Sequence, residues 1–195
     1  MLASDEKFSN SHLDPIPFDF VATTGKMITY KTTGGKDANA FFVKAKMKTD
    51  NWIIMVHEWW GLNDYIKQEA EKLQEEVGNA NVLAIDLYDG EVAAKASEAQ
   101  KLMGGLKEDR AIAIIKGAIV FAGTNQKIYS IGWCMGGGWS LQTSIMAGRE
   151  AAGCVMYYGM PETDKTKLSH LNADVLGIFA KKDEWINQKV VDQFV

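Results

Sequence analysis

The stretch KIYSIGWCMGGGWSLQTSI, residues 127–145, decides the fold, because it passes from a strand pattern into a helix pattern through a cluster of glycines. Its first half is rich in β-branched and aromatic residues, as buried strands are. Cys134 stands at the bend, with Gly132 and Gly136 two positions away on either side. A G-x-nucleophile-x-G pattern between a strand and a helix predicts a nucleophile elbow, a turn that lifts a reactive side chain above a sheet.

The two flanking glycines have a steric role in such a turn. The central residue adopts a strained backbone conformation, so its neighbours two residues away must lack side chains. We expect the Cys134 sulfur to face the amino end of the next helix, where free N–H groups stabilise a thiolate and bind an oxyanion. Gly137 and Gly138 should let the backbone approach a substrate closely. The alternative is that Cys134 is a small buried hydrophobe beside a packing turn, as most lone cysteines are.

The pattern around this stretch predicts a parallel sheet covered by helices on both faces. Short, nearly continuous apolar runs are typical of strands that are buried on both sides. They occupy residues 52–56, 81–88, 127–133, 152–159 and 174–180. Helical periodicity separates them, which indicates right-handed βαβ units and a mostly parallel α/β fold.

Two helical segments are well marked in the sequence. In the first, the apolar residues Ile66, Ala70, Leu73 and Val77 recur at spacings of three and four. Asn63 is a suitable N-cap for this helix, and Gly78 stands where it should end. The second segment, residues 92–122, predicts two helices that are broken near Gly104 and Gly105, the later one burying Ala111, Ile114, Ile115, Ala118 and Ile119.

Residues 1–20 are polar and predict an N-terminal extension on the surface, followed by one domain over residues 21–195. Two β-rich runs around Gly34 and Gly35 indicate a hairpin at the edge of the sheet.

The composition limits the classes of protein and partner. The chain has 195 residues, 47% of them hydrophobic, a net charge of −4 and only two cysteines. These values indicate a folded domain with a small-molecule partner, and they argue against nucleic-acid binding, a membrane span and a disulfide framework. We expect a monomer or small homo-oligomer without a metal or cofactor. We place it in the cytoplasm; the alternative is an exported protein whose signal was removed before numbering.

Three strand ends carry unusual chemistry. They are VHEWWGLND (56–64), GWCMGGG (132–138) and AKKDEW (180–185). Ligands of parallel α/β sheets bind at the carboxyl ends of the strands. We therefore expect these three segments to meet at one site.

Together with AIDLYDG (84–90), GWCMGGGWS (132–140) and GIFAKKDEW (177–185), the first of these motifs resembles the dienelactone hydrolase family, a cysteine branch of the α/β-hydrolase fold. The resemblance covers about Gly25 to Val195. It implies a hydrolase of small esters or lactones that forms an acyl-enzyme on a cysteine.

The resemblance also implies the roles of several residues. Cys134 would be the nucleophile, and the backbone N–H groups of Trp59 and Met135 would form the oxyanion hole. Glu58 would contact the resting thiol and take its proton, unless it is only a solvated loop glutamate. Asp183 would orient the catalytic histidine, a role compatible with capping a helix that begins near Glu184.

The histidine of the triad should follow Asp183 along the chain, and no histidine lies between Asp183 and Val195. We expect it beyond Val195, with a further strand and helix, and little turnover by residues 1–195 alone. Of the histidines present, His57 should point away from Glu58, His170 lies at the wrong end of the sheet and His12 lies in the extension.

The substrate is less well defined by the sequence. Where well-studied family members carry a substrate-binding arginine, this chain has Asp89, Gly90 and Glu91, whose charges should repel an anionic lactone. Trp60, Tyr88 and Trp133, next to Trp59, are candidates for an apolar substrate pocket, although aromatic residues near strand ends are more often core.

Two other functions remain open from the sequence alone. A hydrolase scaffold can serve as a non-catalytic small-molecule-binding protein. A redox-sensing pair of Cys134 and Cys154 is disfavoured, because the two cysteines should lie on neighbouring strands at different depths, too far apart for a bridge.

Overall fold

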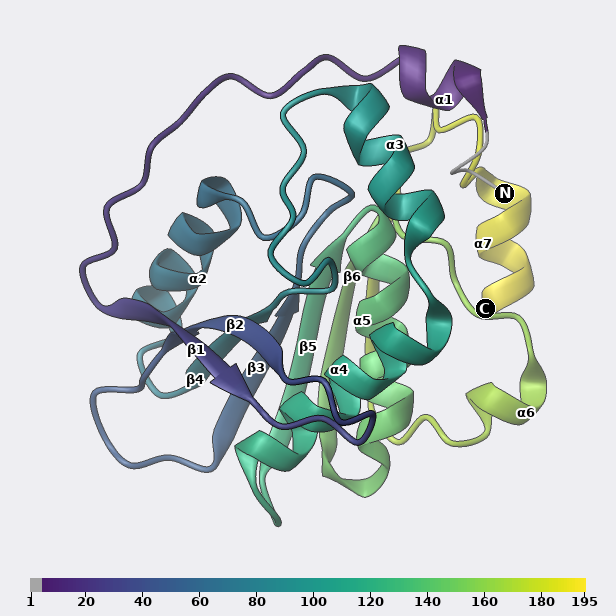
Figure 1. Ribbon diagram of the computed structural model, residues 1–195. Helices are drawn as coiled ribbons and strands as arrows, with labels where there is room; N and C mark the ends of the chain where they lie inside the picture. Colours follow the sequence, from purple (N-terminus) through teal and green to yellow (C-terminus); the bar gives the residue numbers. More distant parts are fainter. Residues whose placement is uncertain (1–4) are drawn as a thin grey trace.

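The computed structural model describes residues 5–195 and consists of one seven-stranded sheet with helices on both faces (Figure 1). The strand order is β1-β2-β4-β3-β5-β6-β7. The strands are β1 (Gly25–Tyr30), β2 (Ala38–Val43), β3 (Asn51–Val56), β4 (Asn81–Ile85), β5 (Lys127–Trp133), β6 (Ala151–Tyr157) and β7 (Val175–Ile178). The predicted mostly parallel α/β sheet is confirmed.

The parallel part of the sheet runs from β4 through β3, β5 and β6 to β7. The central strands β3 and β4 are buried almost throughout, as their continuous apolar runs predict. The hairpin of β1 and β2 pairs antiparallel and adds to β4, also antiparallel, at one edge. The carboxyl ends of the parallel strands consequently lie together.

Helix α2 (Asp64–Val77) covers one face of the sheet, where Ile66 and Ala70 pack on Ile53 and Val82. The Asn63 side chain accepts a hydrogen bond from the Ile66 N–H, and Gly78 ends the helix with a positive φ of 69°. Both ends agree with the sequence pattern. Val77 is an exception, because it is exposed, and Gln74 is the buried residue of that last turn.

The helices α4 (Glu108–Ala122) and α5 (Met135–Ala147) cover the opposite face, and α3 (Ala96–Gly105) lies beyond the strand ends beside α1 (Glu6–Asn10) (Figure 1). The break between α3 and α4 falls where the glycine pair predicts it. In α4, Ala111, Ile114, Ile115 and Ala118 are buried, and Ile119 is partly buried. Helix α5 starts directly at the bend after β5 and lies over β5 and β6.

The first part of the N-terminal segment differs from the expected surface arm, whereas residues 13–20 are exposed or partly exposed and form no helix or strand. The first part forms the short helix α1, which packs against α3 and buries Phe8 against Trp59 and Trp185. The carboxylate of Asp5 accepts a hydrogen bond from the Trp185 indole N–H at 2.9 Å. The segment therefore joins the loop after β7 and helps to build the cavity described below.

The last elements are α6 (Lys165–Leu168) and α7 (Gln188–Phe194), with a 3₁₀ turn at Gly148–Glu150 before β6. Helix α7 begins later than the expected start near Glu184, because Asn187 supplies its N-cap. In the part of the chain that the structure describes, no helix is long and apolar enough to cross a membrane.

The bend at Cys134 has the strained backbone that the glycine pattern predicts. Cys134 has φ 55° and ψ −123°. A Cβ on Gly132 would lie 2.1 Å from the Gly136 carbonyl oxygen, and a Cβ on Gly136 would lie 2.3 Å from the His57 carbonyl oxygen. Real side chains do not approach backbone this closely, so both positions require glycine.

Gly137 and Gly138 serve packing within the chain; Gly138 also lines the cavity described below, whereas Gly137 does not. A Cβ on Gly137 would lie 2.7 Å from the Tyr157 carbonyl oxygen, and one on Gly138 would lie 2.9 Å from that of Met160. These glycines therefore let α5 approach the segment that follows β6.

His57 is a buried structural residue that joins the ends of β3 and β4. Its Nε2 accepts a hydrogen bond from the Leu87 N–H at 3.0 Å, so its Nδ1 carries the proton and donates to the Glu58 carbonyl at 2.6 Å. Burial lowers the pKa of His57 to about 4. The prediction that its side chain points away from the chemistry is confirmed.

Gly136→Ala should lower the free energy of unfolding by about 1–3 kcal/mol or more, because the new Cβ overlaps backbone that cannot move without distorting the bend. Urea denaturation measures the change. Gly105→Ala is the control, since open space surrounds Gly105, and it should change the stability by less than about 0.5 kcal/mol. Equal effects of the two variants would contradict this account of the elbow.

The pKa of His57 predicts a loss of stability in mild acid. The folded-state pKa lies below the unfolded value of 6.5, so the unfolded chain binds the proton first. Neutral His57 therefore contributes to the free energy of unfolding in full above pH 6.5. This contribution is lost as the pH falls toward 4, by up to roughly 3 kcal/mol. Denaturation midpoints across this range should fall less steeply for His57→Gln than for His170→Gln, which changes an exposed histidine. Identical slopes would contradict the assignment.

Candidate active site

The three side chains that the sequence analysis singled out as catalytic line one cavity. Cys134 follows β5, Glu58 follows β3 and Asp183 follows β7, and all three lie on the wall of a cavity of about 960 Å³. Parallel pairing brings the carboxyl ends of β3 and β5 side by side. The predicted meeting of the three strand ends is therefore observed.

The thiol of Cys134 is protonated in the resting protein. Burial, the nearby Glu58 carboxylate and, more weakly, the Asp183 carboxylate raise its pKa to about 12, while the Met135 N–H acts in the opposite direction. The Met135 N–H at the start of α5 favours the thiolate, as expected, but burial and the Glu58 carboxylate outweigh it. The resting thiol therefore needs a base before it can attack.

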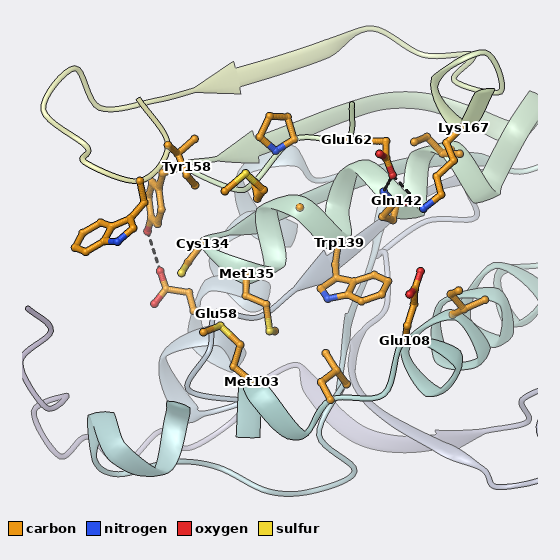
Figure 2. A pocket seen from close by; sticks show the side chains of 18 of the residues that line it. Glu58, Met103, Glu108, Cys134, Met135, Trp139, Gln142, Tyr158, Glu162 and Lys167 are labelled. Atoms are coloured by element: carbon orange, nitrogen blue, oxygen red, sulfur yellow. Dashed lines mark hydrogen bonds and ion pairs between the residues drawn. The ribbon is translucent and has the colours of Figure 1, made fainter. Parts of the chain in front are cut away.

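Glu58 is the base candidate that the geometry provides. Its carboxylate lies in the cavity with the Cys134 sulfur directed toward it (Figure 2). One oxygen, Oε1, accepts a hydrogen bond from the Tyr158 hydroxyl at 2.8 Å. This bond holds the carboxylate in place, so Glu58 is more than a solvated loop residue.

Tyr158 is a site residue that the sequence analysis missed. It has a positive φ of 37°, and its N–H donates to the Ile178 carbonyl at 2.7 Å, which anchors the backbone between β6 and β7. Burial and the Glu58 carboxylate raise the pKa of Tyr158, so the hydroxyl keeps its proton and donates. Its place directly after an apolar strand is the signal that could have found it.

The two backbone N–H groups expected to form an oxyanion hole are not paired with a carbonyl group of the described chain. Within residues 5–195, the N–H groups of Trp59 and Met135 make no hydrogen bond to a carbonyl group. Met135 is the first residue of α5, where N–H groups lack partners within the helix. Trp59 directly follows Glu58. Met135 lines the cavity, and its N–H lies against the Cys134 sulfur, whereas Trp59 is buried and does not line the cavity.

Asp183 lies at the cavity with one carboxylate oxygen already engaged. Its Oδ1 accepts hydrogen bonds from the N–H groups of Trp185 and Ile186, both at 2.8 Å. These bonds cap the short turn that precedes α7. The first turn of α7 itself is capped by Asn187. Among the described residues, Oδ2 has no hydrogen-bond partner, so it can orient a further polar group.

The aromatic residues that line the cavity are not the predicted ones. Trp60, Tyr88 and Trp133 do not line it. Tyr88 is buried below the elbow, where its hydroxyl donates to the Met135 sulfur at 3.2 Å. Trp133 stacks on Tyr157. Trp60 is buried beside Trp59, because residues at these strand ends pack into the core.

The aromatic wall is formed instead by Phe8, Trp139, Tyr158 and Trp185. Phe8 and Trp185 come from opposite ends of the described chain, and Trp139 comes from the second turn of α5. The sequence pattern did not indicate any of them as pocket residues.

The acidic turn after β4 does not face the cavity either. Asp89 forms ion pairs with Arg110 and Lys36. Burial acts to raise its pKa, but the hydrogen bonds from Arg110 and Lys36 hold it below the ordinary value. Neither Asp89 nor Glu91 lines the cavity. These charges therefore do not repel an anionic lactone from the cavity, contrary to our expectation, because Asp89 is paired with Arg110 and Lys36 outside it.

His12 is the histidine that the structure brings to the cavity. Its ring centroid lies 4.5 Å from that of Phe8 and 4.7 Å from that of Trp59, and its Nδ1 lies 2.6 Å from the Phe8 carbonyl oxygen. From the sequence we expected it to lie in the N-terminal extension, away from the site. His170 is exposed and does not line the cavity.

Comparison with solved structures places this geometry in a known fold. A dienelactone hydrolase-like promiscuous phosphotriesterase from metagenomic libraries aligns with a TM-score of 0.71 at 18% identity, over 88% of this chain and 77% of its own. An esterase from Pyrococcus furiosus aligns with a TM-score of 0.63 at 14% identity, over 93% and 82%. These likenesses show the α/β-hydrolase fold.

Sequence comparison gives the family. The protein Usf of Aquifex pyrophilus is 28% identical over 184 residues, which cover 86% of this chain and 76% of the relative. The model of the dienelactone hydrolase family matches residues 39–195. This match includes the elbow, the Glu58 segment and the Asp183 segment, and the chain therefore belongs to the dienelactone hydrolase family.

Proposed function

We propose that the protein hydrolyses carboxylic esters or lactones through an acyl-enzyme on Cys134. The observation that carries the proposal is the convergence of the elbow thiol, a tethered carboxylate and the first residue of α5, Met135, on one cavity. Membership of a hydrolase family supports the reaction class.

The first step transfers the acyl group to sulfur. Glu58 takes the proton from the Cys134 thiol, and the sulfur attacks the ester carbonyl carbon. The N–H groups of Trp59 and Met135 donate to the oxyanion that forms. The bond to the leaving alcohol then breaks, and the proton passes to the alcohol oxygen.

The second step is hydrolysis of the thioester. Water loses a proton to a base and attacks the acyl carbon, the carboxylic acid leaves, and the thiol re-forms. We propose that an imidazole oriented by Asp183 acts as this base. His12 also lines the cavity, but its Nδ1 pairs with the Phe8 carbonyl, and among the described residues no hydrogen bond joins it to Asp183.

The first test removes the thiol. Cys134→Ala should lower kcat/KM on an activated short-chain ester by at least about 10³-fold, because no acyl-enzyme can form. The control is Cys154→Ala, which removes the buried thiol and should leave the rate nearly unchanged. Equal rates for the wild type and Cys134→Ala would remove the thiol from the mechanism. Ligand binding without turnover by the wild type would favour a non-catalytic binding protein instead.

The second test separates the charge of Glu58 from its basicity. Glu58→Gln removes the negative charge that raises the thiol pKa, so iodoacetamide should alkylate Cys134 faster at a given pH. Ester hydrolysis should fall by about 10²-fold or more, because the amide cannot accept the proton. Both rates are measured in a Cys154→Ala background. Glu108→Gln is the control, since this carboxylate lines the same cavity but does not act on the thiol pKa. A parallel change of both rates would contradict the role of Glu58 as a base.

A further inference from the structure

The cavity extends well beyond the thiol, along one face of α5. Met135, Trp139, Gln142 and Met146 line it at spacings of four, three and four residues. From the first to the last of these residues, the helix rises by about 16 Å. Figure 2 shows these side chains one after another along the helix, from Cys134 past Met135 and Trp139 to Gln142. The site therefore offers much more length than a small lactone occupies.

The inner wall of this extension is apolar on both sides of α5. Leu106, between α3 and α4, and Ile112 of α4 contribute partly buried side chains on one side. On the other side, Met160 and Pro161 come from the segment after β6, which Gly138 allows to pack closely on the helix. Partly buried aliphatic walls along a helix fit an aliphatic chain, which gains free energy as it leaves water.

The charged groups lie at the two ends and do not favour an anion. Glu58 and Asp183 lie at the thiol end. At the far end, Glu162 accepts a hydrogen bond from Gln142 at 2.9 Å and pairs with Lys167 at 3.2 Å. Glu108 and Lys116 also line the cavity. The described lining thus holds four carboxylates against two lysines, and one lysine is already paired.

We propose that the preferred substrate is a neutral ester with a medium-length aliphatic chain, which lies along α5 while its carbonyl reaches Cys134. The proposal rests on the proposed esterase function and replaces the small substrate expected from the sequence. It assigns Ile112 and Trp139 to chain-length specificity.

The test compares p-nitrophenyl esters of increasing acyl length on the full-length protein. The value of kcat/KM should rise by about tenfold or more from acetate to octanoate, because each added methylene is buried against the apolar wall. The p-nitrophenyl monoester of octanedioic acid, which adds a terminal carboxylate, should be hydrolysed at least about tenfold less well than the octanoate ester.

A variant that fills the part of the cavity far from Cys134 tests whether the aliphatic chain lies there. Ile112→Trp should lower kcat/KM on the octanoate ester by about tenfold or more and change the acetate value by less than about twofold. Val120→Trp alters an exposed residue of the same helix outside the cavity and should leave both values unchanged. Calorimetric binding of methyl octanoate to Cys134→Ala should be weakened by Ile112→Trp in the same way.

The outcomes separate this inference from the function on which it rests. Hydrolysis of acetate with a steady decline toward octanoate, or equal hydrolysis of the octanedioic monoester, overturns the chain-length inference and leaves the esterase in place. Methyl octanoate binding without hydrolysis of any ester overturns the proposed function and leaves the apolar site in place.

Discussion

The positive φ at Cys134 is the constraint on which the rest of the site depends. This conformation brings the start of α5 so close to β5 and to the end of β3 that carbonyl oxygens occupy the space of two side chains. Glycine at positions 132 and 136 removes the collision. In return, the turn places the thiol at the mouth of a cavity, with the first N–H groups of α5 beside it. A change in either glycine therefore acts on the sheet, the helix and the site together.

The fold was predictable because its signals are local and repeated. Apolar runs mark the strands, and the Asn63 and Gly78 ends mark α2, since capping depends on residues close in sequence. The structure of the N-terminal segment was not predictable in this way. Phe8 has no neighbouring apolar pattern, and it is buried only because Trp59 and Trp185 approach it from distant parts of the chain. Long-range contacts of this kind leave no periodic trace.

The site was predictable in its reactive groups and not in its surroundings. Cys134, Glu58 and Asp183 follow strands, and topology alone brings such positions together. The lining depends on which side chains the core does not use. Trp60 and Tyr88 are buried in the core, whereas Trp139 and Tyr158 line the cavity. The ionisation of the thiol also escaped prediction, because it reflects a balance between burial, two carboxylates and one backbone N–H.

The protonated state of Cys134 has a consequence for the durability of the protein. Oxidants such as hydrogen peroxide attack thiolates far faster than thiols, and the sulfenic acid that results no longer acts as a nucleophile. A sulfur whose pKa is raised by burial and by a neighbouring carboxylate therefore reacts more slowly with peroxide between encounters with its ligand. The surroundings that keep the resting group unreactive thus also help to preserve it in its reduced form.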